Sequence, residues 1–256
     1  MTDVAFIQHV EALRQDGRLD EVLHVLEQRY AATEAMPAPE RTDYFFTLFE
    51  WKLLIVAYPP AAAALARARD GQARRLLAGE YHVGSAVHDP MHFQRADRLG
   101  LLVEMNRTLW DPESTRAVFL QLEAQDPALA RREAYRVLEA VVEAGDFALA
   151  ERYRRDPLAG LGNVNHAAQS LPLFPPGREA PMLAADLSNL CKDVRIAIAV
   201  LRGLGREPEA LALRRALLEG LANEELRAVA ERELDEPGAI HRIQGERQAA
   251  LDEPGE

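Results

Sequence analysis

The stretch Gly145-Asp146-Phe147-Ala148-Leu149-Ala150-Glu151-Arg152-Tyr153 decides the fold class of this 256-residue chain. A glycine can end a helix in a left-handed conformation that costs other residues more, and apolar residues resume directly after it. Related turns occur at Gly17-Arg18-Leu19-Asp20-Glu21-Val22 and at Gly205-Arg206-Glu207-Pro208-Glu209-Ala210. All three predict pairs of antiparallel helices joined by a short turn.

The Gly145 stretch resembles the junction between helix A and helix B of a tetratricopeptide repeat, because a glycine, an acidic residue, an aromatic residue and then an alanine follow in order. The resemblance covers three hairpins, at residues 3–33, 130–155 and 186–222. It implies an all-α fold, a right-handed superhelix (α-solenoid) of stacked antiparallel helix hairpins. The three turn glycines are not spaced by the length of that repeat, so the array is irregular.

Other segments also have a helical pattern. The segment Tyr44–Tyr58 is apolar on nearly all sides, which predicts a central helix buried on most sides. Pro59 and Pro60 then predict a new helix that runs to about Ala78, since proline is tolerated in a first turn. Three Asp-Pro pairs predict helix starts, with aspartate as the N-cap; they are Asp89-Pro90, Asp111-Pro112 and Asp126-Pro127.

A segment rich in proline and glycine divides the chain. Residues 157–182 interrupt the helical periodicity, with a short helix expected near Asn163–Leu171. We therefore expect an N-terminal stack of helical hairpins at 1–156, a connector or binding loop at 157–182, and C-terminal helical hairpins with a polar tail at 183–256. Long irregular segments often carry function, but a plain linker explains this one equally well.

Composition limits the class of partner. The formal net charge is −11, which argues against binding nucleic acid phosphates and fits a basic protein partner or a solvated acidic surface. The single cysteine, Cys191, excludes an intramolecular disulfide, and its place on an apolar stripe predicts a buried thiol. Neither a signal peptide nor a membrane span is expected, so the predicted location is the cytoplasm.

One cluster could carry metal chemistry. His88, Asp89 and His92, with His82 and Asp97 nearby, offer imidazole and carboxylate ligands, and a metal-dependent hydrolase is the alternative function. Pro90 interrupts the segment, so the two histidines do not share one helical face, and capping explains Asp89. The chain has no convincing nucleophile or dinucleotide motif, and we expect no enzyme activity and no cofactor.

The polar side of the 186–204 helix predicts a binding site. In the resembled family, helix A lines a concave groove that holds peptides or helices through Asn, Lys and Arg side chains, and the matching residues here are Asn189, Lys192 and Arg195. A solvated helix face is the alternative. Trp51 and Trp110 could anchor a partner, but burial explains both more simply.

The sequence thus predicts a non-catalytic scaffold that binds another protein or a peptide. A bacterial accessory, regulatory or immunity-type role follows from this prediction, in which an acidic surface meets a basic partner. Self-association through an exposed end of the solenoid is a further alternative.

Overall fold

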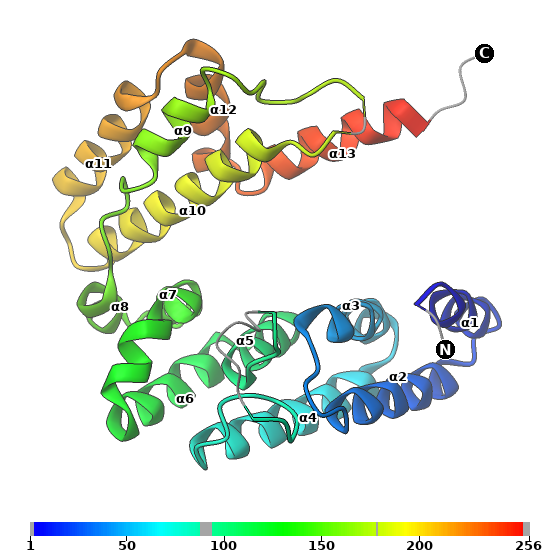
Figure 1. The fold of residues 1–256 in the computed structure, drawn as a ribbon. Helices are drawn as coiled ribbons and strands as arrows, with labels where there is room; N and C mark the ends of the chain where they lie inside the picture. The colour runs from blue at the N-terminus through cyan, green and yellow to red at the C-terminus, as the bar shows by residue number, and fades with distance from the viewer. Residues whose placement is uncertain (1–2, 88–93, 178, 253–256) are drawn as a thin grey trace. The chain divides into compact units, whose positions relative to one another are not determined.

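The computed structural model describes residues 3–87, 94–177 and 179–252 (Figure 1). Within these ranges the chain forms thirteen α-helices and no strand, which confirms the all-α prediction. None of the helices in these ranges is both long and apolar enough to cross a bilayer.

The chain divides into two compact units, an N-terminal unit (Met1–Ala144) and a C-terminal unit (Gly145–Glu256). The sequence had suggested a boundary after residue 156. The helices of the N-terminal unit are α1 (Asp3–Gln15), α2 (Leu19–Glu34), α3 (Arg41–Ala57), α4 (Pro59–Leu77), α5 (Arg98–Leu109), α6 (Pro112–Gln125) and α7 (Pro127–Glu143). Those of the C-terminal unit are α8 (Phe147–Tyr153), α9 (Leu161–Ala167), α10 (Met182–Gly203), α11 (Glu207–Gly220), α12 (Glu224–Asp235) and α13 (Ala239–Asp252).

The N-terminal unit has two layers of helices. Each helix packs against the next in sequence, and α1, α3, α5 and α7 also contact one another in that order. Figure 1 shows these four helices in one layer and α2, α4 and α6 in the other. Buried apolar side chains fill the space between the layers, among them Phe6, Leu26, Trp51, Leu65 and Met105.

The turns that decided the fold class have the expected backbone. Gly17, Gly145 and Gly205 all have positive φ, at 71°, 76° and 74°. After Gly17, the amide of Arg18 donates to the carbonyl of Leu13, and after Gly205 the next amide reaches back to Leu201 in the same way. These bonds satisfy carbonyls that a helix end would otherwise leave unpaired.

Two of the three Asp-Pro starts are confirmed, and the third falls on residues that the structure does not describe. Asp111 and Asp126 cap α6 and α7. Asp89-Pro90 lies outside the described residues, but the helix expected to run on from it begins only at Arg98. Its N-cap is Asp97, whose carboxylate accepts from the Gly100 amide at 2.7 Å.

Tertiary hydrogen bonds keep the chain before Arg98 out of a helix. The Ala96 amide donates to the Pro39 carbonyl at 2.8 Å, and its own carbonyl accepts from Val83 at 3.0 Å. The buried guanidinium of Arg95 also donates to the Val83 carbonyl, at 2.8 Å from Nη2. Backbone groups committed to these partners cannot form a helical ladder.

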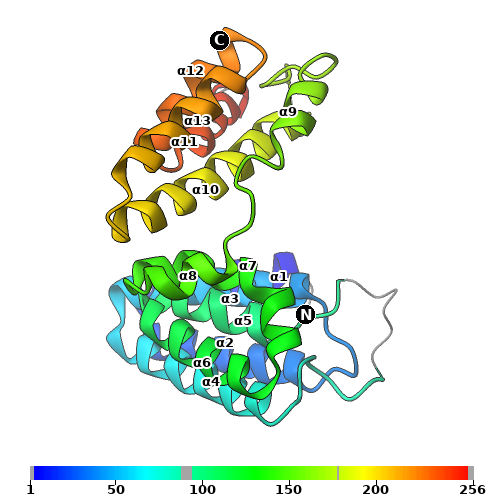
Figure 2. The ribbon, with the colours of Figure 1, turned by 90° about the vertical axis from the view of Figure 1, so that its left-hand side faces the viewer.

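The long helix α10 organises the C-terminal unit. It contacts α8, α9, α11 and α12, and Figure 2 shows α9 and α11 lying along it. A row of buried apolar residues that includes Cys191 runs along its length. The proline-rich segment packs onto this unit: the Asn165 amide nitrogen donates to the Gly220 carbonyl at 2.7 Å, and Leu173 is buried.

Candidate functional site

Two hollows lie side by side on the layer of odd-numbered helices in the N-terminal unit. The first, which we call the Trp110 pocket, has a volume of about 300 Å³ between α5 and α7. The second, the α3–α5 groove, has a volume of about 340 Å³ between α3 and α5. Arg136 of α7 lines both hollows.

Trp110 occupies an unusual position at the rim of its pocket. It ends α5 in the left-handed region, with φ 55° and ψ 41°, and it is the one residue other than glycine with positive φ in the described part of the chain. The side chain is 89% exposed. Only Asp111 separates it from α6, so the chain must turn at Trp110 itself.

Asp111, the N-cap of α6, stabilises the turn from the side of that helix. Its carboxylate accepts from the Ser114 amide at 3.1 Å and from the Ser114 hydroxyl at 2.6 Å, and the Arg69 guanidinium donates to it at 2.8 Å. Burial alone would raise the pKa of Asp111, but the hydrogen bonds from Ser114 and Arg69 outweigh burial and lower that pKa. A charged, well-bonded cap therefore holds Trp110 in its turn.

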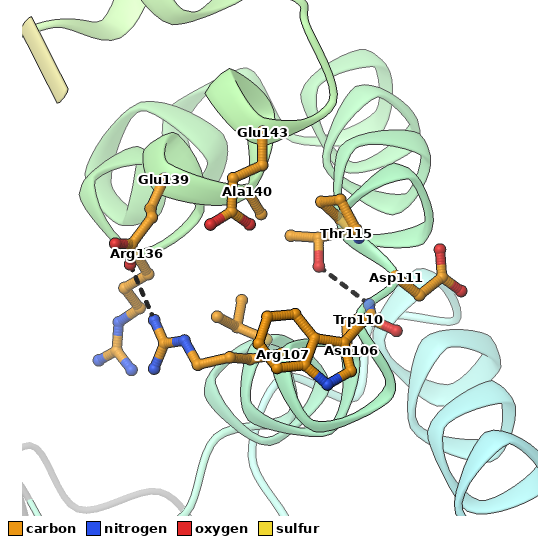
Figure 3. Close-up of a pocket in the computed structure, with 11 residues that line it drawn as sticks. Asn106, Arg107, Trp110, Asp111, Thr115, Arg136, Glu139, Ala140 and Glu143 are labelled. Carbon is orange, nitrogen blue, oxygen red and sulfur yellow. Dashed lines mark hydrogen bonds and ion pairs between the residues drawn. The ribbon is translucent and has the colours of Figure 1, made fainter. Parts of the chain in front are cut away.

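A buried polar pair forms the wall behind the indole. The Asn106 amide nitrogen donates to Thr115 Oγ1 at 2.9 Å, and the Asn106 carbonyl oxygen accepts from Arg69 at 2.5 Å (Figure 3). Both Asn106 and Thr115 are at most 1% exposed. With its hydrogen bonds satisfied, this wall is rigid and supports the rim on which Trp110 lies.

Charged side chains face the pocket from α5 and α7. Arg107 donates to Glu139 at 3.1 Å and to Glu104 at 3.4 Å. Figure 3 shows the Glu143 carboxylate pointing into the hollow on the side opposite the Trp110 indole. The pocket thus combines an aromatic face with carboxylates, which suits a side chain that is cationic or amphipathic.

Arg136 stands between the two hollows and is held firmly. Its guanidinium donates to Asp97 at 3.0 Å and pairs with Glu133 at 2.9 Å. Burial would lower the pKa of Arg136, but the nearby charges, led by Asp97, raise it. The arginine therefore links the N-cap of α5 to α7 as a permanent cation.

The α3–α5 groove is aromatic and cationic. Phe45 and Phe49, one helical turn apart on α3, are 59% and 47% exposed, and their rings stack with centroids 6.2 Å apart. Lys52 follows on the same helix, is exposed, and has no ion pair among the residues described. Glu104 and Arg41 complete the charged rim.

The residues predicted on α10 lie in the C-terminal unit. Asn189 is exposed, while Lys192 and Arg195 are half-buried. Arg195 approaches Glu233 of α12 at 3.8 Å and lines a hollow of about 370 Å³ with Arg202 and Arg214. The two other predicted residues do not line this hollow, so their joint role stays a prediction.

The predicted metal cluster falls largely outside the described residues. His88, Asp89 and His92 all lie within 88–93, of which the structure describes nothing. Asp97 caps α5 and pairs with Arg136, and the His82 ring contacts Tyr81 edge-on. In the ranges that are described, no group of three or more His, Cys, Asp or Glu side chains is arranged to hold a metal ion.

Cys191 is buried, as predicted. Its burial, and to a smaller extent the nearby Glu233 charge, raises the pKa of its thiol to about 12.

The two tryptophans differ in their exposure to solvent. Trp51 is 1% exposed and donates to the Ala61 carbonyl at 2.9 Å, as expected, but the predicted burial of Trp110 is wrong. The signal was present, because a tryptophan directly before an Asp-Pro helix start must lie in the turn.

Helix α4 carries four arginines, Arg67, Arg69, Arg74 and Arg75, and three of them have a carboxylate partner. Arg69 pairs with Asp70 and Asp111, and Arg75 pairs with Glu34. Arg67 approaches Glu27 at 3.5 Å.

Comparison of the chain with protein-family models, with curated proteins and with solved structures finds no match.

Proposed function

We propose that the chain is a non-catalytic scaffold, a tetratricopeptide-like superhelix of helical hairpins, that binds another protein or a peptide. Its binding face is the layer of α1, α3, α5 and α7, and the site is centred on the Trp110 pocket. The observation that carries this proposal is Trp110, an exposed indole held in a left-handed turn at the edge of a hollow.

Both features of Trp110 cost the isolated chain stability. A left-handed conformation costs a residue with a side chain about 1–2 kcal/mol, and glycine is the usual occupant of this position. An exposed tryptophan also gives up about 2 kcal/mol or more that burial would supply. A partner that covers the indole recovers this burial, and tryptophan and arginine are the residues most often found at the energetic centre of protein interfaces.

The surroundings of Trp110 favour recognition by a preformed surface. Asn106, Thr115 and Asp111 have satisfied hydrogen bonds, and the arginines on the rim are held by carboxylates. A rigid surface loses little conformational entropy on binding. The proposed scaffold catalyses no reaction. We also propose that it acts in the cytoplasm of a bacterium, in an accessory, regulatory or immunity-type role.

Affinity capture tests the proposal. The 256-residue chain, immobilised, is exposed to a lysate of the organism that makes it, and retained proteins are identified by mass spectrometry. Trp110→Ala removes the indole, while Leu211→Ala truncates an apolar residue of the C-terminal unit that is 54% exposed and serves as the matched control. We expect a partner retained by the wild type and by Leu211→Ala but lost from Trp110→Ala. A partner retained equally by all three would overturn this site.

A further inference from the structure

We propose that the α3–α5 groove receives an acidic, apolar segment of the partner, in which a large apolar side chain lies within about one helical turn of an aspartate or glutamate. This inference rests on the proposed binding function and specifies what the second hollow of the same face recognises. It is independent of the Trp110 pocket because it depends on side chains of α3, which do not line that pocket.

The apolar part of the inference comes from a row of side chains on α3. Phe45, Phe49, Leu53 and Val56 follow one another at helical spacing and are 59%, 47%, 39% and 88% exposed. The opposite side of α3 is buried through Tyr44, Leu48 and Trp51. Helix α3 therefore has two apolar faces, and only one of them is buried in the N-terminal unit. An exposed apolar row of this kind marks an interaction surface.

The groove beside this row can hold an apolar side chain. Phe49 and Leu48 line it from α3, and Leu101 lines it from α5. Its volume of about 340 Å³ is within the range of small ligand sites, and it is large enough for a leucine or an aromatic ring. The stacked pair Phe45–Phe49 forms a flat wall on which such a side chain can pack.

The acidic part comes from the charges around the groove. Arg41 and Lys52 of α3 line it, together with Glu104 and with Arg136, whose charge is already balanced by Asp97 and Glu133. Arg107 already donates to Glu104 at 3.4 Å, whereas Lys52 has no ion pair in the described part of the chain. The groove is thus locally cationic in a chain of net charge −11. A partner carboxylate gains a charge-assisted bond here, and a basic partner is disfavoured at this point.

A second copy of the chain fits the groove less well. Two copies bring together net charges of −11 each, and that repulsion opposes association. A short acidic segment instead offers its charge only where the groove is cationic. The inference therefore commits to a partner segment, and self-association is an outcome of the test.

Selection from a library of random peptides displayed on phage, with the 256-residue chain as bait, supplies the probe. We expect the enriched peptides to share a large apolar residue next to an aspartate or glutamate. A synthetic peptide of that sequence should bind Phe49→Ala about tenfold more weakly than the wild type. Light scattering of the free chain checks self-association: a dimer abolished by Phe49→Ala would overturn the inference in favour of a second copy.

Two exposed cations provide a matched pair of variants. Lys52→Glu and Arg215→Glu each replace a cation by a glutamate, one in each unit. We expect Lys52→Glu to weaken peptide binding about tenfold or more and Arg215→Glu to leave it unchanged. If the peptide responds to Trp110→Ala, or to Lys192→Glu in the site predicted on α10, but not to Lys52→Glu and Phe49→Ala, this inference is wrong and the scaffold function stands. If no selected peptide binds, this inference is wrong, and affinity capture alone decides the scaffold function.

Acylation of lysines in the unaltered protein gives a readout that needs no variant. The bound peptide should slow acylation of Lys52, measured by mass spectrometry, and leave the rate at Lys192 unchanged. Equal rates at Lys52 with and without saturating peptide would contradict the placement of the acidic group.

Discussion

At the scale of single residues, Trp110 combines two costs that a folded chain normally avoids, a left-handed backbone and an exposed indole. The sequence placed this residue in the interior because tryptophan is usually largely buried. The structure places it in a two-residue link between α5 and α6, where geometry leaves no path to the core. The caps Asp111 and Asp126 were predictable because aspartate before proline has a strong local preference.

The first prediction separates the strain at Trp110 from the indole. Trp110→Gly should raise the free energy of unfolding by up to about 1 kcal/mol, because glycine adopts positive φ without steric cost. Trp110→Ala keeps the unfavourable backbone and should bring no such gain. Both variants lack the indole and should lose partner binding equally. Urea denaturation followed by circular dichroism measures stability; a destabilised Trp110→Gly would contradict the argument.

The second prediction concerns acid. The pKa of Asp111 is lower in the folded chain than the value of about 3.9 expected in the unfolded chain. Its stabilisation is therefore complete above about pH 4 and is lost as the pH falls through the folded-state pKa. Asp111→Asn should cost about 1 kcal/mol near neutral pH, because the ion pair with Arg69 is lost while the cap is kept. This difference should shrink as the pH falls below about 4 and through the folded-state pKa.

Asp126→Asn is the control for that experiment. Asp126 caps α7 through the Leu129 amide at 2.9 Å, and in the described ranges it has no arginine partner. The substitution should therefore change stability little at either pH. Equal costs for both variants would show that the Arg69 pair contributes nothing.

At the scale of helices, hydrophobic spacing and turn residues located most of the helices but not their contacts. The starts of α6 and α7 follow from Asp-Pro pairs, and the end of α7 follows from Gly145. The start of α5 did not follow, because tertiary bonds of Ala96 and Arg95 override the local signal. The exposure of the apolar row on α3 could not be predicted either, because periodicity alone does not show which apolar face of a helix packs against another helix.

The third prediction tests the packing of α8 on α10. A Cβ atom added at Gly203 would lie 2.2 Å from the ring of Phe147, so Gly203→Ala must displace α8. We expect a loss of about 1–3 kcal/mol in the free energy of unfolding. Gly245→Ala, in α13, meets no atom within 4 Å and should be neutral or stabilising by up to about 1 kcal/mol. A neutral Gly203→Ala would contradict the assignment of α8 to the C-terminal unit.

At the scale of the whole molecule, the boundary between the two units was not predictable from the pattern of prolines and glycines. Proline-rich residues 157–182 looked like a boundary, yet Asn165 and Leu173 pack within the C-terminal unit, and the division falls at Gly145. Composition favoured a basic partner through the net charge, whereas the α3–α5 groove is locally cationic. Net charge averages over surfaces that recognise different groups, so it cannot locate a site.

The fourth prediction uses the two tryptophans, both of which lie in the N-terminal unit. Tryptophan fluorescence reports unfolding of that unit alone, while circular dichroism reports helices of both. Gly203→Ala should therefore lower the midpoint of the dichroism transition and leave the fluorescence midpoint unchanged. Coincident shifts of both midpoints would show that the two units unfold as one.

Collisional quenching of tryptophan fluorescence by iodide tests the central claim, that partners bind over Trp110, most directly. Trp110 is 89% exposed and Trp51 is 1% exposed, so the quenchable emission belongs to Trp110, and Trp110→Ala should abolish it. Saturation with a tryptophan-free fragment of the partner identified by affinity capture should shield this emission and shift it to shorter wavelength. Saturable binding confirmed by calorimetry, with quenching and emission unchanged, would contradict the account.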